Sequence, residues 1–477
     1  MTMCRGTAMK RQCAWIAAGA ALLATSCALK NPPDAAAIKA EAMPKVVVPQ
    51  TWSAIPSKAS IVTDNWLASF HDDQLVAAVN EAIASNPDLR VAATRVETAM
   101  LYAKLAGARL YPSVDLLMRG GLKLSGDNSG MQGGLLSANW ELDLWGRVRY
   151  GRAAAAADAM AQQADYEFAR QSMAAAVAKN WFLATEAAMQ AEVARQTIQR
   201  SLDLVSLAET RSRVGVGNDE EIFVARSTVG TYQDALREIE LAQSQAIRGL
   251  ELLLGRYPAA AAAVTAKLPA QPEEIPAGLP SELLERRPDV IAAERRVAAA
   301  FNRVGEAKAA RLPAIALTAG VSAISSDLIV LKDHDNPVWN LGANLLAPIY
   351  RGGALKTQVE IRTSEQKQSV AAYASVGLRA FGEVENALAA ELAAKQRETI
   401  LAQVAADSER ALGIVQTQFR VGSTDLRFVN QRQLAVNSAQ AAVIRMQAEQ
   451  RVQRVNLHLA LGGSFEARPV NPPPPPK

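Results

Sequence analysis

The sequence is poor in the residues that build catalytic and metal centres. It contains three histidines and three cysteines among 477 residues, and Cys4 and Cys13 lie in a segment with the features of an export signal. Loss of that segment leaves Cys27 as the sole thiol, which excludes structural disulfides and cysteine-ligated metals. No H-E-x-x-H, phosphate-loop or G-x-S-x-G motif is present, so no nucleophile and base pair stands out. We expect no enzymatic activity, no cofactor and no metal site.

Aromatic residues are also scarce, at 5% of the chain, whereas alanine carries much of the 49% hydrophobic content. This composition is typical of long helices that pack through small side chains, and it argues against a bulky globular core. The formal net charge is only +4, because 51 basic residues nearly balance 47 acidic ones. The two kinds of charge are interleaved along the chain. Without a basic stripe, nucleic-acid binding gains no support.

The N-terminus resembles a lipoprotein signal. Lys10 and Arg11 precede an apolar run over residues 14–24, which is too short to span a bilayer. Small residues then lead into Cys27, with alanine in place of the usual leucine three residues before it. We therefore predict a signal peptide over residues 1–26 and lipidation of Cys27, which would hold this end of the chain at a membrane. An ordinary secretory signal with an incidental cysteine is the alternative.

The most informative feature is an internal duplication with a period of about 200 residues. Pro288 lies 201 residues after Pro87, and Pro313 lies 201 residues after Pro112. Later motifs match at offsets of 205 and 207: Leu144-Trp145-Gly146 with Ile349-Tyr350-Arg351, and Arg213-Val214-Gly215 with Arg420-Val421-Gly422. Each half is predicted to fold as helix, strand, strand, long helix, turn and helix.

Two segments free of proline are predicted to form very long helices. Residues 146–212 would reach about 100 Å at ~1.5 Å per residue, and residues 354–419 are their counterpart. Shorter helices are expected over residues 73–110 and 282–311, each interrupted by a proline. Helices of about 100 Å cannot be buried in a compact domain, so they must pack side by side as a coiled coil.

Between the helices of each half, apolar and polar residues alternate as in an amphipathic β-hairpin. Residues 112–145 and 313–349 show this pattern, with Trp140 and Trp339 among the apolar positions. The strands approach the roughly 9 to 11 residues that cross a bilayer, although a soluble sandwich would show the same alternation. Because lipid does not tolerate open sheet edges, four strands require further copies, and a trimer would supply twelve.

Several motifs resemble TolC-like outer-membrane factors, in particular the NodT-type outer-membrane efflux lipoproteins of tripartite pumps. The matching segments, which together cover about residues 60–463, are residues 66–75, 86–89, 279–289, 339–353 and 381–388. The resemblance implies a passive exit duct that exports small molecules, such as drugs or toxic compounds, across the outer membrane. A soluble periplasmic coiled-coil scaffold or adaptor lipoprotein is the alternative, but it leaves the two hairpins unexplained.

The fold implied by this resemblance is mainly α with a membrane β-hairpin pair and a duplicated helix-strand-strand-long helix-helix unit. It implies a homotrimer, in which a twelve-stranded outer-membrane β-barrel continues as a periplasmic α-helical barrel. The implied partners are a periplasmic adaptor (a membrane fusion protein), an inner-membrane RND-type transporter and outer-membrane lipid. The implied location is the outer membrane, with a lipid anchor and a large periplasmic portion.

The expected organisation follows the duplication. The predicted segments are a signal peptide (1–26), a lipid-anchored extended tether (27–60), a first repeat (61–258, with its hairpin at 112–145), an equatorial linker (259–281), a second repeat (282–463, with its hairpin at 313–349) and a Pro-rich tail (464–477).

The resemblance places adaptor contact at the two helix-turn-helix tips. The predicted contact residues are Arg213, Val214, Gly215, Arg420, Val421 and Gly422. Acidic residues near the tips are candidates for the pore constriction: Asp219, Glu220, Glu221 and Asp425. In the second half, Phe428 and Gln431 stand where the family often has acids. Glycines at sharp turns and acids at helix starts are also explained by turn geometry and by the helix dipole, so both interpretations stay open.

Overall fold

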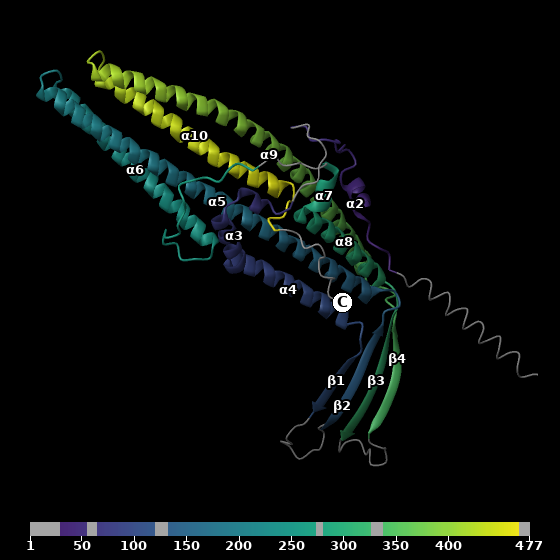
Figure 1. Ribbon diagram of the computed structural model, residues 1–477. Coiled ribbons are helices and arrows are strands. Elements are labelled where there is room, and N and C mark those ends of the chain that lie inside the picture. Colours follow the sequence, from purple (N-terminus) through teal and green to yellow (C-terminus); the bar gives the residue numbers. More distant parts are fainter. Residues whose placement is uncertain (1–28, 55–63, 120–131, 273–279, 326–336, 467–477) are drawn as a thin grey trace, which may run out of the picture. The chain divides into compact units, whose positions relative to one another are not determined.

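The computed structural model describes residues 29–54, 64–119, 132–272, 280–325 and 337–466 (Figure 1). The predicted signal peptide and Cys27 lie outside the described residues. So do the hairpin turn at 125–130, most of the turn at 333–337, and the tail from residue 467 onward.

The two halves contain the same elements in the same order, which confirms the predicted duplication. The first half has α4 (Pro87–Ala108), β1 (Ser113–Arg119), β2 (Gln132–Leu142), α5 (Arg147–Arg213) and α6 (Asp219–Leu253). The second half has α8 (Pro288–Ala309), β3 (Ala314–Ser325), β4 (Val338–Leu346), α9 (Ala354–Arg420) and α10 (Leu426–Ala460). Helices α5 and α9 both have 67 residues, α6 and α10 both have 35, and α9 and α10 each begin 207 residues after their counterparts.

Shorter elements precede these repeats: α2 (Ala35–Ala42), η1 (Trp66–Phe70), α3 (Asp73–Ser85), η2 (Pro280–Glu282) and α7 (Leu283–Arg286). The prediction of an extended tether is wrong for the residues of α2. There Asp34 accepts a hydrogen bond from the Ala37 N–H at 2.8 Å and caps a helix, and Ile38 is buried. Ile38 and the residue at the end of the helix, Met43, are both buried, so this segment packs against other parts of the chain.

Side-chain caps and prolines explain where the other helices begin. Asp72 accepts hydrogen bonds from the N–H groups of Gln74 and Leu75, both at 3.0 Å, and so starts α3. Pro87 and Pro288 occupy the first positions of α4 and α8, where the missing N–H would have no helical partner. Among the helices that the structure describes, none is both long and apolar enough to cross a membrane.

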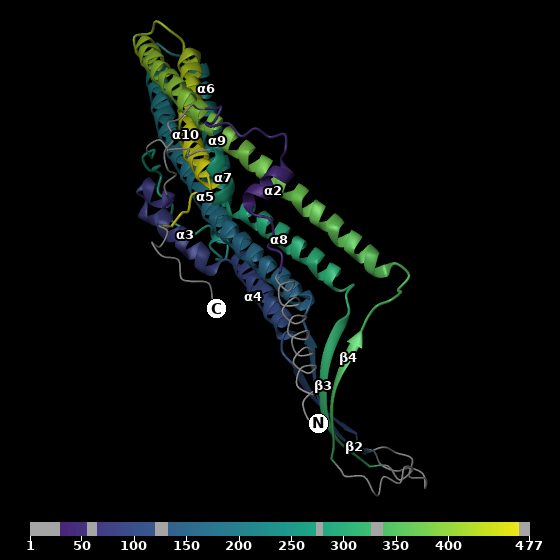
Figure 2. The same ribbon diagram turned by 90° about the vertical axis from the view of Figure 1, so that its right-hand side faces the viewer.

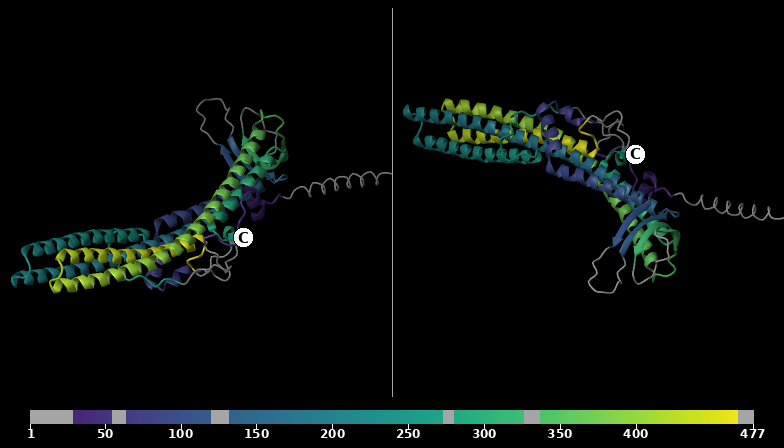
Figure 3. Two further views of the ribbon diagram at one scale, coloured as in Figure 1. Left: turned by 90° about the horizontal axis from the view of Figure 1, so that it is seen from above. Right: turned by 90° about the horizontal axis from the view of Figure 1, so that it is seen from below.

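The described chain forms two compact units that cut across the repeats. One comprises the described residues of Met1–Val46, Thr94–Ala164 and Ile291–Val376, and it contains the sheet. The other comprises the described residues of Val47–Ala93, Asp165–Val290 and Gly377–Lys477. In this second unit, the α5–α6 hairpin and the α9–α10 hairpin run side by side in both views of Figure 3.

The four strands form one antiparallel sheet in the order β1-β2-β3-β4, so the β2–β3 pair joins the two halves (Figure 1). Figure 2 shows α8 leading into β3 and β4 leading back to α9. Residues directly opposite each other in neighbouring strands point to the same face. The resulting rows across the sheet, from β1 or β2 to β4, are Leu116–Leu136–Val321–Trp339, Val114–Ala138–Ala319–Leu341, Trp140–Leu317–Ala343 and Leu142–Ile315–Leu345. The predicted alternation therefore becomes one continuous apolar face.

The opposite face of the sheet is polar in its central rows. Ser137 lies opposite Asp115 and Gly320, and Asn139 lies opposite Thr318. The strand register therefore separates the apolar side chains from the polar ones over both repeats. A one-residue slip would mix the two sets, which explains why this register is strongly specified.

The core of the second unit combines aromatic rings with small side chains. Phe70 packs against Phe182 with ring centroids 5.2 Å apart, and Trp66 stacks on His458 at 5.6 Å. Ala174, Ala175 and Ala178 of α5 are buried in the same cluster. Small residues on this face of α5 allow its backbone to approach the neighbouring elements closely, as the alanine-rich composition predicts.

His458 makes the stability of this core dependent on pH. Its side chain is 3% exposed, and burial, followed by the charge of Arg454, lowers its pKa from 6.5 to about 3. The folded protein therefore keeps His458 neutral, whereas the unfolded chain takes up a proton as the pH falls below 6.5. The free energy of unfolding should decrease by about 2 kcal/mol between pH 6.5 and pH 5 from this residue.

Thermal unfolding of the detergent-extracted protein between pH 7 and pH 5 tests this prediction. The variant His458→Phe keeps a ring against Trp66 but cannot titrate, so its melting temperature should fall less steeply with pH than that of the parent protein. Equal slopes in the two proteins would contradict the assignment.

Candidate functional site: the helix tips and the amphipathic sheet

Both predicted contact motifs form the turn between two long helices. Gly215 and Gly422 have φ angles of 77° and 79°, in the left-handed region. The Val216 N–H donates to the Arg211 carbonyl oxygen at 3.0 Å, and the Ser423 N–H donates to the Gln418 carbonyl oxygen at 2.9 Å. These bonds follow the Schellman pattern, in which a glycine just past the helix end allows the chain to reverse. The two tips therefore share one backbone design, again 207 residues apart.

Apolar side chains project from the two tips. Val214 is 65% exposed and Val421 is 75% exposed, and Val216, Phe223 and Phe428 are exposed as well. Exposed apolar side chains that are grouped together are typical of a surface that binds another protein. Their grouping at the tips agrees with the predicted contact residues, whose role stays a prediction.

The structure brings three of the four candidate pore acids into the first turn of α6. Asp219, Glu220 and Glu221 all lie there, where the helix dipole favours negative charge, and Asn218 caps the same turn by accepting from the Glu221 N–H at 2.9 Å. Asp425 occupies the equivalent cap position of α10 but forms no capping hydrogen bond.

The side chains of these acids differ in their contacts. Ser212 Oγ lies 3.3 Å from Asp219 Oδ1, and Asp425 forms an exposed ion pair with Arg427 at 3.3 Å. Glu221 is different, because it pairs with Arg211 at 3.5 Å and both side chains are mostly shielded from solvent. The helix dipole favours all three α6 acids, and Glu221 has an ion-pair partner in addition. The role of the four acids in a pore constriction stays a prediction.

Sequence reasoning missed Arg211, which connects the two tips. It belongs to α5, yet its guanidinium carbon lies 4.7 Å from the ring centroid of Phe419 in α9, and its Nη1 donates to the Phe419 carbonyl oxygen at 3.1 Å. Phe419 is fully buried in an apolar cluster that also contains Leu412, Leu426 and Val429. The sequence offers one indication that Arg211 is special. The position equivalent to it in the second repeat holds the uncharged Gln418.

Indole groups tie the ends of the strands to the adjoining backbone. Trp140 Nε1 donates to the Leu110 carbonyl oxygen at 2.9 Å, and Trp145 Nε1 donates to the Pro313 carbonyl oxygen at 2.8 Å. Tyr111 and Tyr350 are exposed next to the same strand ends. Aromatic side chains at this level are typical of a membrane interface.

The comparisons with known proteins agree with this arrangement of long helices and an amphipathic sheet. The family model described as "Outer membrane efflux protein" matches residues 78–256 and 279–463. The pyoverdine export outer membrane protein OpmQ of Pseudomonas putida is 30% identical over 88% of this chain and 93% of its own length. The cation efflux system protein CusC of Escherichia coli is 28% identical over 89% of this chain and 94% of its own length.

Solved structures give the same result. The open state of the Neisseria gonorrhoeae MtrE outer membrane channel has a TM-score of 0.77 at 26% identity, covering 92% of this chain and 98% of that one. The Campylobacter jejuni CmeC outer membrane channel has a TM-score of 0.81 at 21% identity, covering 92% and 95%, and this likeness concerns the fold alone.

The fold and the relatives define an outer-membrane efflux channel, which confirms the predicted fold class and function. The chain belongs to the outer membrane efflux protein family, because the family model matches well over half of its residues. OpmQ and CusC are both named for export or efflux, and neither name describes a soluble scaffold or an adaptor, so the alternative interpretation has no support.

The tip glycines give a direct test of the turn geometry. Gly422→Ala places a side chain at a φ of 79°, and since no heavy atom lies within 4 Å of the added Cβ, the strain comes from the backbone alone. We expect a loss of about 1–2 kcal/mol in the stability of this tip. Gly413→Ala, in the interior of α9 and equally free of neighbours, is the matched control and should stabilise the helix by up to about 1 kcal/mol.

Hydrogen exchange of the amides at residues 417–428 measures this difference. Faster exchange in Gly422→Ala and unchanged or slower exchange in Gly413→Ala is the expected result. Equal exchange in the two variants would mean that the turn does not depend on the left-handed glycine.

Proposed function

We propose that three copies of this chain form one passive exit duct, with a shared twelve-stranded barrel in the outer membrane and a helical barrel in the periplasm. The observation that carries this proposal is the continuous apolar face of the four-stranded sheet. Strands β1 and β4 each pair on one side only within the described chain. Because unpaired backbone groups are costly in hydrocarbon, β4 of one copy would pair with β1 of the next.

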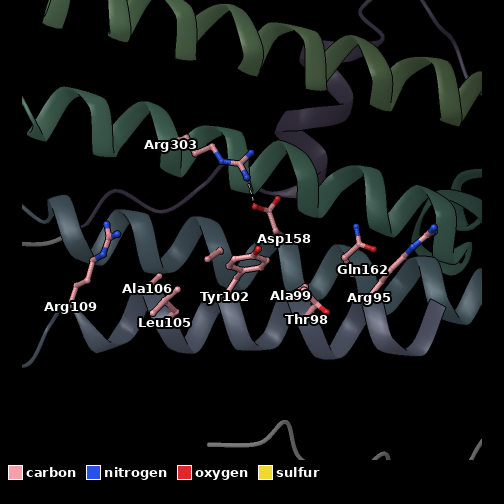
Figure 4. A pocket seen from close by; sticks show the side chains of 11 residues that line it. Arg95, Thr98, Ala99, Tyr102, Leu105, Ala106, Arg109, Asp158, Gln162 and Arg303 are labelled. Atoms are coloured by element: carbon pink, nitrogen blue, oxygen red, sulfur yellow. Dashed lines mark hydrogen bonds and ion pairs between the residues drawn. The ribbon is translucent and has the colours of Figure 1, made fainter. Parts of the chain in front are cut away.

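Helix α4 supports the same assembly. It leads directly into the edge strand β1, and Leu101, Tyr102 and Leu105 on its surface are exposed. Figure 4 shows α4 side chains along a groove of about 770 Å³, on whose other side Arg303 pairs with Asp158. An exposed apolar helix face beside an unpaired sheet edge fits contact with a second copy.

The duct itself would supply no energy. The proposed partners are a periplasmic adaptor, which would bind the two tips through Arg213–Gly215 and Arg420–Gly422, and an inner-membrane RND-type transporter that drives the flux. The exposed apolar side chains at the tips support adaptor contact there. The cargoes that the names of the relatives specify are a cation for CusC and pyoverdine for OpmQ. We propose that this chain likewise exports small molecules.

We retain the predicted segment limits, from the signal peptide at 1–26 to the tail at 464–477, as a proposal. Lipidation of Cys27 would anchor the N-terminus in the outer membrane, and most of the helical part would lie in the periplasm. A lipid chain contributes about 0.8 kcal/mol per buried methylene.

Metabolic labelling with radioactive palmitate tests the anchor. We expect label in the parent protein and none in Cys27→Ser, because no other cysteine remains after signal removal. Label retained in Cys27→Ser, or no label in either protein, would contradict lipidation of Cys27.

Reconstitution into a planar lipid bilayer tests the channel function. The purified protein should produce discrete conductance steps, because a shared barrel encloses a continuous aqueous path. If it inserts as an assembled oligomer and yields no steps under any applied voltage, the duct proposal is wrong.

The acids near the tips give a test of the proposed constriction. Simultaneous substitution of Asp219, Glu221 and Asp425 by Ala removes charge from the narrow end of the duct, so single-channel conductance should rise at least about twofold. Unchanged conductance in the triple variant would remove these three residues from the gate.

A further inference from the structure

We propose that the groove between α4, α5 and α8 is a binding site for organic anions that pass through the duct, in particular anions with an aromatic body. This inference rests on the duct and the lipid anchor proposed above, and it names a class of cargo for that duct. It gives a role to Arg95 and Arg109, which lie outside the predicted contact motifs and pore acids.

The groove is large and carries an excess of positive charge. Its volume is about 770 Å³, within the range of roughly 300–1,000 Å³ that is usual for small-molecule sites. Three arginines line it, Arg95, Arg109 and Arg303, against one acidic residue, Asp158. Arg303 is paired with Asp158, so these two charges cancel. The groove therefore keeps the charges of Arg95 and Arg109.

Arg95 and Arg109 are available to a ligand. Both are exposed, and neither forms a hydrogen bond or an ion pair with a described residue. A planar guanidinium can donate two parallel hydrogen bonds to one carboxylate, which gives it both charge and shape preference for that group. The two arginines therefore favour an anionic ligand.

The part of the groove between these arginines offers an aromatic surface. Figure 4 shows Tyr102 between Arg109 and Arg95, and Leu105 lies near Tyr102. Tyr102 is 64% exposed. A separation of 14 residues corresponds to about 21 Å along a helix, so an aromatic body can lie on Tyr102 while its anionic group reaches one arginine. Leu101 does not line the groove and stays free for contact with a second copy.

The groove opens on a different side of α5 from the one that binds the N-terminal segment. A Cβ at Gly146 would lie 2.9 Å from Leu29 Cδ2. The Lys30 N–H donates to the Tyr150 hydroxyl at 3.0 Å. At 3.6 residues per turn, Asp158 of the groove lies roughly 80–120° round α5 from Gly146 and Tyr150. The groove is thus turned away from the face that residues 29 and 30 cover.

The proposed lipid anchor decides which of these sides faces the lumen. Cys27 lies two residues before Leu29, and its lipid chain must reach the membrane outside the duct. The face of α5 that contacts Leu29 is therefore the outer face. The groove then faces the lumen, where passing molecules can contact it.

The duplication alone does not account for the chemistry of the groove. At the offset of 201 residues, Arg303 stands in place of Tyr102, and Ala310 stands in place of Arg109. The second repeat has therefore not kept the aromatic residue or this arginine. Each copy has the combination in its first repeat, and a trimer would place three such grooves around the lumen.

Block of the current in a planar bilayer tests the site. Naphthoate is the probe, and naphthamide, which has the same rings without the charge, is the control ligand. The double variant Arg95→Gln, Arg109→Gln is compared with Arg90→Gln, Lys104→Gln. The control pair also removes two positive charges from exposed positions of α4, but from outside the groove.

Naphthoate should block the parent protein at a concentration at least about tenfold lower than naphthamide does. The groove variant should need at least about tenfold more naphthoate, whereas the control variant should behave as the parent does. Parental block in the groove variant, or equal block of the parent by the two ligands, would overturn the site, while discrete conductance steps leave the duct standing. If the assembled protein gives no conductance, the duct is wrong and the site falls with it.

Should the double variant fail to assemble, Arg109→Gln beside Lys104→Gln decides, and parental block by naphthoate in Arg109→Gln overturns the site. Thr98→Cys tests whether a second copy fills the groove, because Thr98 lines it. An anionic methanethiosulfonate should shift the conductance of this variant in steps and leave the parent unchanged. No shift, with the thiol still unmodified by mass spectrometry, would show that the groove is covered in the assembly and would overturn the proposal.

Discussion

The rest of the structure depends on the need to pair every backbone N–H and C=O group that lies in hydrocarbon. One chain offers four strands with a continuous apolar face, and its outer strands β1 and β4 each have one edge that no described strand occupies. An unpaired polar group in lipid costs several kcal/mol, so edges of several residues cannot be left open there. The duplication supplies two hairpins in place of one, and the β2–β3 pair merges them into a single sheet. A symmetric assembly would then satisfy both edges at once.

The lengths of the long helices also reflect the duplication. The matched lengths of α5 and α9, and of α6 and α10, give each copy two hairpins of equal reach, so both tips can end at one level of a ring. Within this near-symmetry the two tips differ in side chains and not in backbone. Arg211 and Glu221 of the first repeat correspond to Gln418 and Phe428 of the second. Within one copy, Arg211 therefore contacts the ring and the carbonyl group of Phe419, and the second repeat has no charged side chain at the equivalent position.

Local patterns in the sequence predicted most of the fold. Period-two alternation indicated the hairpins, and the absence of proline indicated the long helices, because both signals act within a few residues. Contacts that join distant segments were not predictable in this way. Arg211 lies 208 residues from Phe419, and Glu251 accepts backbone N–H groups of Ala260, Ala261 and Ala262 at 2.7–2.9 Å, although a carboxylate in a helix ordinarily faces solvent. Trp52 lies in the predicted tether, yet it is buried and packs against Phe381, and the adjacent Ser53 N–H donates to Glu385 at 2.9 Å.

The shared barrel is the central claim, and the oligomeric state and location of the full-length protein test it most directly. Membrane fractionation, followed by detergent extraction and light scattering with correction for bound detergent, measures both. The account predicts a trimer recovered from the outer membrane. A monomer in the soluble periplasmic fraction would contradict it, because a single chain leaves the apolar face and both sheet edges without a partner.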